Sequence, residues 1–277
     1  MSTSGPWTSA HVDSWLVNTG RPLTTKDGKA VEVYEFQHQP VDAVLSAWAK
    51  HFRHHYCGDD EIDALRSGTG LSKEDYLKNL VFPDSTGKPG PSVRAGDFAE
   101  ILLTDYLEYV LRHWTPRFRY DSKASRNEST RGADIIGFQF VGAGESPGDT
   151  LTLFEVKARL SGPMPRNRLQ EAADDSAKDF RVRKAEILNA LKRRCLRDGR
   201  HDEAARVERF QDKADRPYHE VSGAAAVLTT TAYDPATLAG TDASKHPNAA
   251  NLALVVIKGD DLMRLVHDLY GRAAREA

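Results

Sequence analysis

Residues 151–160, with the sequence LTLFEVKARL, place the strongest constraint on the fold of this chain. The apolar residues at their start predict a buried β-strand, in which residues i and i+2 share a face. Glu155 and Lys157 therefore lie on one face of the strand, and Phe154 and Val156 on the other. Two interpretations remain open at this point: a solvated edge strand that carries an ion pair, or a charged site within a sheet.

The length and composition fit a globular protein with one large α/β domain or two modest ones. The chain has 277 residues, of which 40% are hydrophobic, and a formal net charge of −2. Between residues 116 and 200, however, 18 Lys and Arg stand against 12 Asp and Glu, a local excess of +6. This excess is either a chance fluctuation or a basic face suited to phosphate groups on an otherwise acidic protein.

The cysteines and the first residues predict a cytoplasmic protein. Cys57 and Cys195 lie far apart, and the polar start MSTSGPWTSA does not resemble a signal peptide, so no disulfide framework is expected. No apolar run approaches the roughly 20 residues that a membrane-spanning helix requires, so we expect no membrane association through such a helix.

Prolines and glycines at 83–92 predict a boundary between an N-terminal α-rich region, 1–90, and a second region, 91–277. The first region is long enough to be a partner-docking or regulatory module. It is expected to contain a strand at 31–38 and helices at 41–52, 59–68 and 72–82. In the second region the residue patterns predict, in order, a helix at 95–114, strands at 117–120, 132–141 and 150–160, a helix from about 170 to 198, a charged helix to about 213, strands at 222–231 and 251–258, and a closing helix at 259–276.

Three acidic residues are candidates for one metal site. Asp134 enters the apolar strand 21 residues before Glu155, and an antiparallel hairpin of the two strands brings both carboxylates together. Glu100 shares its helix face with Leu103 and Leu107, which predicts that it reaches the same end of the sheet. Carboxylates beside a lysine and a backbone carbonyl form a hard oxygen site that suits Mg²⁺ or Mn²⁺.

Asp134 and the run Glu155-Val156-Lys157, within this order of helices and strands, resemble the PD-(D/E)xK nuclease superfamily. Ala133 stands where that motif has proline. The resemblance implies an α/β fold with a restriction-endonuclease-like core, a mixed sheet flanked by helices, to which the N-terminal α-rich region is an extension. It also implies phosphodiester hydrolysis: Asp134, Glu155 and the Val156 carbonyl bind the metal, and Lys157 positions water or stabilises the phosphate.

A narrower resemblance covers most of the chain. The segments HHYCGDDEIDALR, GPSVRAGDFAEILLTDYLEYVL, RYDSKASRNESTRGADIIGF and LFEVKARLSG are similar to the HamA family, the nuclease subunits of the Hachiman anti-phage defence system. This resemblance implies a nuclease that degrades DNA with little sequence specificity and is held inactive by a superfamily 2 helicase partner, HamB. Two alternatives remain: a catalytically silent nuclease-fold adaptor that binds nucleic acid or a helicase, and a restriction or repair nuclease of the same fold.

Several basic residues near the motif are candidates for contacts to DNA phosphates. They lie in the loop before Asp134, just after the motif, and on the later helix: Lys123, Arg126, Arg131, Arg159, Lys178, Arg181 and Lys184. Each of them fits a solvated surface position as well, and Lys184 either extends to the surface or points to the active-site groove.

A group of histidines and a cysteine in the first region has the residue types of a zinc site. His51, His54, His55 and Cys57 are close in sequence, but no second ligand pair follows at a suitable spacing. A structural role near a helix end is therefore expected.

Overall fold

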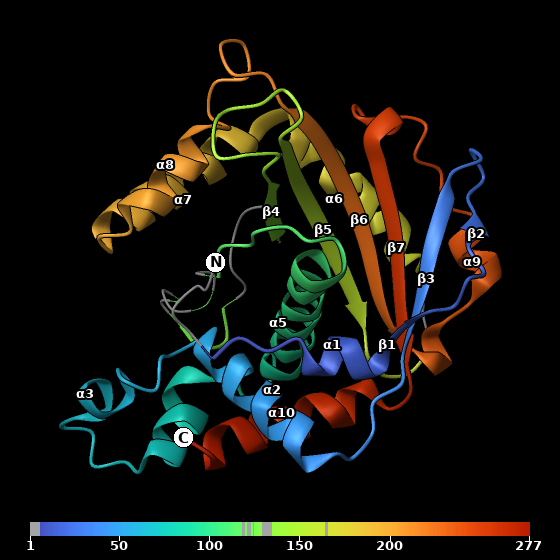
Figure 1. The fold of residues 1–277 in the computed structure, drawn as a ribbon. Coiled ribbons are helices and arrows are strands. Elements are labelled where there is room, and N and C mark those ends of the chain that lie inside the picture. The colour runs from blue at the N-terminus through green and yellow to red at the C-terminus, as the bar shows by residue number, and fades with distance from the viewer. Residues whose placement is uncertain (1–5, 118–119, 121–122, 124, 129–134, 164–165) are drawn as a thin grey trace.

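The fold is a mixed β-sheet flanked by helices, as Figure 1 shows for the computed structural model. The structure describes residues 6–117, 120, 123, 125–128, 135–163 and 166–277. Within them, seven strands form one sheet in the order β1-β3-β7-β6-β5-β4, with β2 paired to β3. The strands are β1 (Leu16–Asn18), β2 (Leu23–Thr24), β3 (Ala30–Phe36), β4 (Ile135–Gln139), β5 (Thr150–Arg159), β6 (His219–Thr229) and β7 (Leu252–Gly259).

The middle of the sheet is parallel and its edges are antiparallel. Strands β3, β7, β6 and β5 run parallel to one another, while β4 pairs antiparallel with β5, and β1 and β2 pair antiparallel with β3. The near-continuous apolar sequences of β6 and β7 fit this position, because parallel strands are covered on both faces. The predicted strands at 150–160, 222–231 and 251–258 and the predicted antiparallel hairpin are confirmed.

Helices cover both faces of the sheet (Figure 1). The described helices are α1 (Ala10–Trp15), α2 (Asp42–His54), α3 (Ile62–Arg66), α4 (Lys73–Tyr76), η1 (Leu77–Val81), α5 (Gly90–Asp105), η2 (Tyr106–Val110), α6 (Arg168–Val182), α7 (Lys184–Arg197), α8 (His201–Glu208), η3 (Thr230–Ala232), α9 (Pro235–Ala239), η4 (Ala249–Asn251) and α10 (Leu262–Arg275). On one face, α2, α5 and α10 enclose the larger core, which includes Trp48, Phe98 and Leu102. On the other face, α6 packs against β5 and β6.

Small side chains set the packing of the central strands. Ala224 and Ala226 of β6 face Leu169 and Ala172 of α6, so the helix lies close to the sheet. Next to them, Gly223 leaves room for the Phe154 ring, since a Cβ at this position would lie 2.3 Å from two ring carbons. The glycine and the alanines thereby fix the position of β5 relative to both helical layers.

The N-terminal residues belong to the same sheet as the rest of the chain. β3 pairs with β7 over Val31↔Leu254 to Glu35↔Lys258, and α2 packs against α10. Residues 1–90 therefore contribute three strands as well as helices. Their proposed role as a docking or regulatory module stays a prediction.

Two predicted elements differ from the structure. The strand expected at 117–120 is wrong in its described part, because neither Arg117 nor Tyr120 lies in a strand, and Trp114 instead forms a β-bridge with Phe138. The helix expected from 170 to 198 is two helices, α6 and α7, separated at Arg183. Among the described residues, no helix has the length and apolar character needed to cross a membrane.

Candidate active site

Strand β5 carries Glu155 and Lys157 side by side, as its alternation predicts. The Lys157 Nζ lies 3.6 Å from the Glu155 Oε2. Phe154 and Val156 point the other way, into the core that contains the α5 residues. Glu155 is 4% exposed, while the side chain of Lys157 is 28% exposed. The pair is therefore not a fully solvated edge: a buried carboxylate adjoins an ammonium group that solvent can reach.

Helix α6 adds a second carboxylate to this pair. The Lys157 Nζ lies 2.7 Å from the Asp175 Oδ2, and the Lys178 Nζ lies 2.6 Å from the Asp175 Oδ1. Partial burial raises the pKa of Asp175, but the two lysines outweigh this and hold it below the ordinary value. Asp175 is thus kept ionised, and it fixes the direction in which the Lys157 ammonium points.

Helix α5 carries a separate pair of buried acids. Glu100 accepts a hydrogen bond of 2.5 Å from the Tyr120 hydroxyl. Asp97, one turn earlier, accepts from the Tyr56 hydroxyl and from the Lys123 Nζ, each at 2.6 Å. Both carboxylates are at least nine-tenths buried, so their polar partners are what makes their burial tolerable.

The carboxylates of Glu100 and Glu155 belong to different layers of the fold. Glu100 belongs to the helix that covers the face of Phe154 and Val156, whereas Glu155 and Lys157 alternate toward α6. Asp134 lies outside the described residues. Its neighbour Ile135 pairs with Phe154, the residue before Glu155. The sharing of one metal ion by Asp134, Glu155, the Val156 carbonyl and Glu100 therefore stays a prediction.

The described part of this predicted site offers oxygen donors of the kind that Mg²⁺ and Mn²⁺ prefer. Glu155 is a buried carboxylate, and the backbone carbonyls of its own strand are next to it in sequence. Glu100 is a second buried carboxylate. No histidine or cysteine is among these predicted ligands, so the donor set is hard and suits these ions better than Zn²⁺.

Five of the predicted DNA-binding side chains have acceptors in the described part of the protein, among them Lys123, Arg126 and Arg159. Lys123 is buried against Asp97, with its Nζ 4.9 Å from the centroid of the Tyr120 ring. Arg126 lies 2.8 Å from the Asp84 Oδ2 and donates to the Lys78 carbonyl. Arg159 donates from its Nε to the Pro163 carbonyl at 3.0 Å. These contacts give each side chain a structural role, and a DNA contact stays a prediction.

The remaining predicted DNA-binding residues differ in exposure. The Lys178 side chain is 66% exposed and close to Lys157 through their shared partner Asp175. Lys184 donates to both carboxylate oxygens of Glu220 at 2.9 Å. Arg131 lies outside the described residues, as does the side chain of Arg181. Lys178 is thus the described candidate best placed to meet a phosphate near Lys157.

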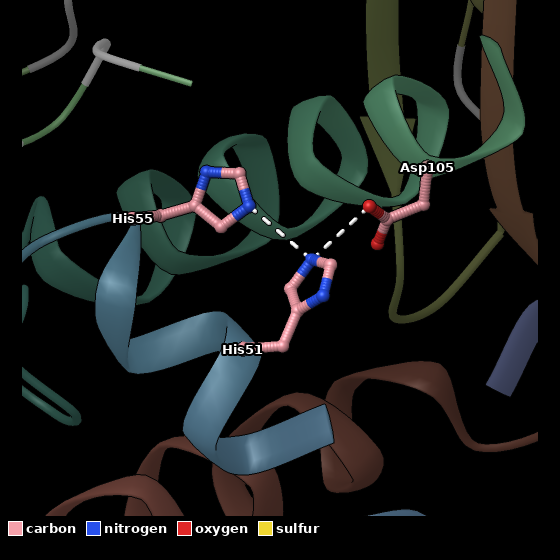
Figure 2. Close-up of side chains that lie close together, drawn as sticks. All are labelled: His51, His55 and Asp105. Carbon is pink, nitrogen blue, oxygen red and sulfur yellow. Dashed lines mark hydrogen bonds and ion pairs between the residues drawn. The ribbon is translucent and has the colours of Figure 1, made fainter. Parts of the chain in front are cut away.

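A second cluster of ionisable groups lies between α2 and α5. Figure 2 shows His51 and His55, from the end of α2, and Asp105, at the end of α5, pointing toward one another. The His51 Nε2 is 3.1 Å from the Asp105 Oδ1 and 3.4 Å from the His55 Nε2, and His11 approaches the Asp105 Oδ2 at 2.8 Å. By residue type and spacing, His51, His55 and Asp105 could hold a metal ion.

The contacts of this cluster do not fit a metal. The Arg117 guanidinium lies between the same atoms: its Nη1 is 2.9 Å from the His55 Nε2 and 3.1 Å from the His51 Nε2, and its Nη2 is 2.7 Å from the Asp105 Oδ1. In addition, the Thr8 backbone N–H donates to the His51 Nδ1. The proton of a neutral His51 is then on Nε2, where it faces Asp105, so this nitrogen has no lone pair for a metal.

Burial and charge keep this cluster in one protonation state. Burial and the neighbouring Arg117 lower the pKa of His51 to about 4, although Asp105 opposes this. Burial on its own would raise the pKa of Asp105, but His51 and Arg117 hold it well below the ordinary value. Burial also raises the pKa of the Cys57 thiol to about 12, so this thiol is protonated at neutral pH. The structural role expected for these histidines is supported.

Sequence reasoning missed Asp97, Arg117 and Asp175. Asp97 precedes Glu100 by three residues, about one helical turn, so helical spacing could have found it. Asp175 follows the buried Ala172 by three residues, at the border of the stripe that faces the sheet. Arg117 carries no local signal, because its partners Asp105 and His51 come from two other elements.

A search of curated proteins found no match. The HamA family model matches residues 10–273, nearly the whole chain, including both strands of the hairpin, α5 and α6. The chain therefore belongs to the HamA family, a family of the Hachiman antiviral defence system.

Proposed function

We propose that this chain is a metal-dependent deoxyribonuclease of the PD-(D/E)xK type that acts as the effector of a Hachiman system. The observation that carries the proposal is the position of Lys157, 3.6 Å from the buried Glu155 and 2.7 Å from Asp175. An ammonium group that is held by carboxylates yet partly open to solvent is suited to a phosphate that carries developing negative charge.

In this proposal each residue has one task. Asp134 and Glu155 hold Mg²⁺ or Mn²⁺ through their carboxylate oxygens, with the Val156 carbonyl and Glu100 as further ligands. The bound ion supplies Lewis acidity that lowers the pKa of water and neutralises charge on the phosphate. Lys157 stabilises the phosphate oxygens during hydrolysis, and Asp175 keeps its ammonium group in place. Lys178, whose exposed side chain contacts Asp175, attracts the DNA backbone.

The test is cleavage of plasmid DNA by the purified chain in the presence of Mg²⁺. Glu155→Gln and Lys157→Met are each expected to lower the rate by about 10²-fold or more, as for loss of a group that stabilises transition-state charge. Lys178→Met is the matched control, because Lys178 contacts the same Asp175 but is far more exposed. It should change the rate by about tenfold or less and make cleavage more sensitive to salt.

The outcome also separates the alternatives. A wild-type chain that binds DNA but leaves plasmid intact, with Mg²⁺ or Mn²⁺, would favour the silent adaptor. A fixed set of fragments would favour a restriction role, whereas a smear fits cleavage with little sequence specificity. Equal rates for wild type and Lys157→Met would contradict the role given to this lysine.

We further propose that residues 1–90 dock a HamB-like superfamily 2 helicase. Among the described residues, large exposed apolar side chains gather in this region, where Leu65 of α3 is 53% exposed and Leu80 of η1 is 52% exposed. Deleting 1–90 would remove β3 from the sheet, so point changes give a cleaner test. Leu65→Asp with Leu80→Asp should abolish co-purification with the helicase, whereas Leu196→Asp, on α7, should not.

A further inference from the structure

A groove outside the predicted nuclease site lies at the end of the sheet where β4 and β5 are joined. Its walls come from the residues after η2, from β4 and the β4–β5 connection, and from α8 with the segment that follows it. Figure 1 shows α7 and α8 extending beside this edge of the sheet. The groove encloses about 1030 Å³. This is at the upper end of the range for small-molecule sites, about 300–1,000 Å³, so more than one nucleotide-sized group fits.

Aromatic rings on rigid backbone form one wall of the groove. Trp114 and Phe138 exchange two backbone hydrogen bonds, of 2.7 and 2.9 Å, and their rings are 5.2 Å apart. The Phe140 ring lies 6.2 Å from that of Trp114. Phe138 is fully buried, whereas Trp114 and Phe140 are half-buried and line the groove. Rings held in this way are platforms on which planar groups such as bases stack.

Arginines surround these rings. The Arg206 guanidinium lies 5.7 Å from the centroid of the Trp114 ring, and that of Arg209 lies 4.9 Å from the centroid of Phe140. Arg112 and Arg216 also line the groove. Guanidinium groups beside aromatic faces suit a ligand that has both planar rings and negative charge.

The acidic residues of the groove are already neutralised. Three glutamates line it, and each has a basic partner: Glu108 contacts Arg117, Glu145 contacts Arg216, and Glu208 contacts Lys192. Arg112, in contrast, is exposed and has no hydrogen bond or ion pair to any described residue. Two of the lining arginines are likewise paired, Arg209 with Asp149 and Arg216 with Glu145 and Glu208, so the positive charge that the groove offers to a ligand depends on Arg112.

The backbone of Arg112 is a second sign that its side chain has a role in binding. Arg112 has φ 60°, in the left-handed region, directly after the helix that ends at Leu111. Glycine is the usual residue at such a position, because a Cβ is disfavoured there. Glycine would hold this position with less backbone strain, so an arginine here, with no hydrogen bond or ion pair to any described residue, points to a role for its side chain outside the fold.

We propose that this groove binds single-stranded DNA, with bases stacked on Trp114 and Phe140 and phosphates near Arg112 and Arg206. The proposal rests on the proposed nuclease function and assigns it a substrate form. Phe138 pairs with Leu151, four residues before Glu155 on β5, so the groove and Lys157 are separated by roughly 15–20 Å along one strand. A strand held in the groove can extend along the edge of the sheet to reach Lys157.

The test is fluorescence anisotropy with a labelled oligothymidylate of about 12 nucleotides and the full chain in EDTA. Without divalent metal the measurement reports binding alone. Arg112→Gly, which suits the left-handed backbone, and Trp114→Leu are each expected to weaken binding by about fivefold or more. Arg112→Lys, which keeps the charge, should retain most of the affinity. The control is Arg264→Ala, which removes an exposed positive charge from α10.

Wild-type affinity in both Arg112→Gly and Trp114→Leu would overturn the proposal, as would an equal loss in Arg264→Ala. So would displacement of the oligonucleotide by polyglutamate at equal charge concentration, because an acidic protein segment would then be the better occupant. The two proposals fail separately. If the wild type cleaves plasmid and the groove variants bind the oligonucleotide as tightly as the wild type, the nuclease proposal stands and the groove proposal fails. If the wild type does not cleave plasmid but the groove variants bind more weakly, the groove proposal stands and the nuclease proposal fails.

Discussion

Two clusters of acids and cations in this molecule use the same groups in opposite ways. Around Asp105, the Arg117 guanidinium is enclosed by carboxylates and imidazoles, and its side chain is 3% exposed. Around Glu155, the Lys157 ammonium is held by two carboxylates but its side chain is 28% exposed. The first cluster contains its own cation and excludes others. The second leaves its cation accessible to a ligand. The first arrangement fits a role in stability, and the second fits the proposed role in phosphate chemistry.

The largest effect is expected from Arg117→Met. This change leaves the buried Asp105 and the half-buried Glu108 without the guanidinium that contacts both of them. We expect the free energy of unfolding to fall by about 3–5 kcal/mol, as for the loss of one partner of a buried ion pair. Urea unfolding followed by circular dichroism measures it. Arg66→Met, which breaks the exposed pair with Asp63, is the control and should leave the free energy of unfolding almost unchanged, because solvent screens this pair. A similar loss in both variants would contradict the structural role given to Arg117.

The second prediction concerns the loss of stability of the folded protein at acidic pH. Burial lowers the pKa of His51 in the folded protein to about 4, with Arg117, His11 and His55 around it and Asp105 opposing. The unfolded chain, with a histidine pKa of about 6.5, therefore binds the proton first as the pH falls. The contribution of His51 to the free energy of unfolding is therefore fully present above about pH 6.5. It is lost as the pH falls from 6.5 to 4, by about 3 kcal/mol in total.

Urea unfolding at a series of pH values tests this assignment. In His51→Gln the decline between pH 6.5 and 4 should be smaller than in the wild type. The control is His219→Gln, at an exposed position of β6, which should leave the slope unchanged. If the wild type and His51→Gln lose stability in parallel over this range, the buried histidine is not the acid-sensitive group, and the Arg117 cluster loses its assigned role.

The sequence predicted those parts of both regions that depend on local pattern. The alternation in 150–160 placed Glu155 beside Lys157, and the apolar runs at 222–231 and 251–258 predicted two buried strands. Other features depend on distant parts of the chain. The pairing of β3 with β7 joins residues more than 200 positions apart, and the contacts of Arg117 join three elements. The break between α6 and α7 at Arg183 has no glycine or proline to mark it.

The smallest effect, and the finest test of the comparison, is expected from Asp175→Asn. The amide is the same size and still accepts a hydrogen bond from Lys157, but the negative charge that helps to hold this ammonium group is lost. Because the side chains of both residues are partly exposed, stability should change by about 1 kcal/mol or less. Plasmid cleavage should fall by about tenfold or less, since Glu155 still adjoins Lys157. Asp175→Glu, which keeps the charge, should recover part of the rate. A loss as large as that in Lys157→Met would instead place Asp175 among the groups that bind the metal or the substrate, and a loss of stability as large as that in Arg117→Met would make the two clusters equivalent.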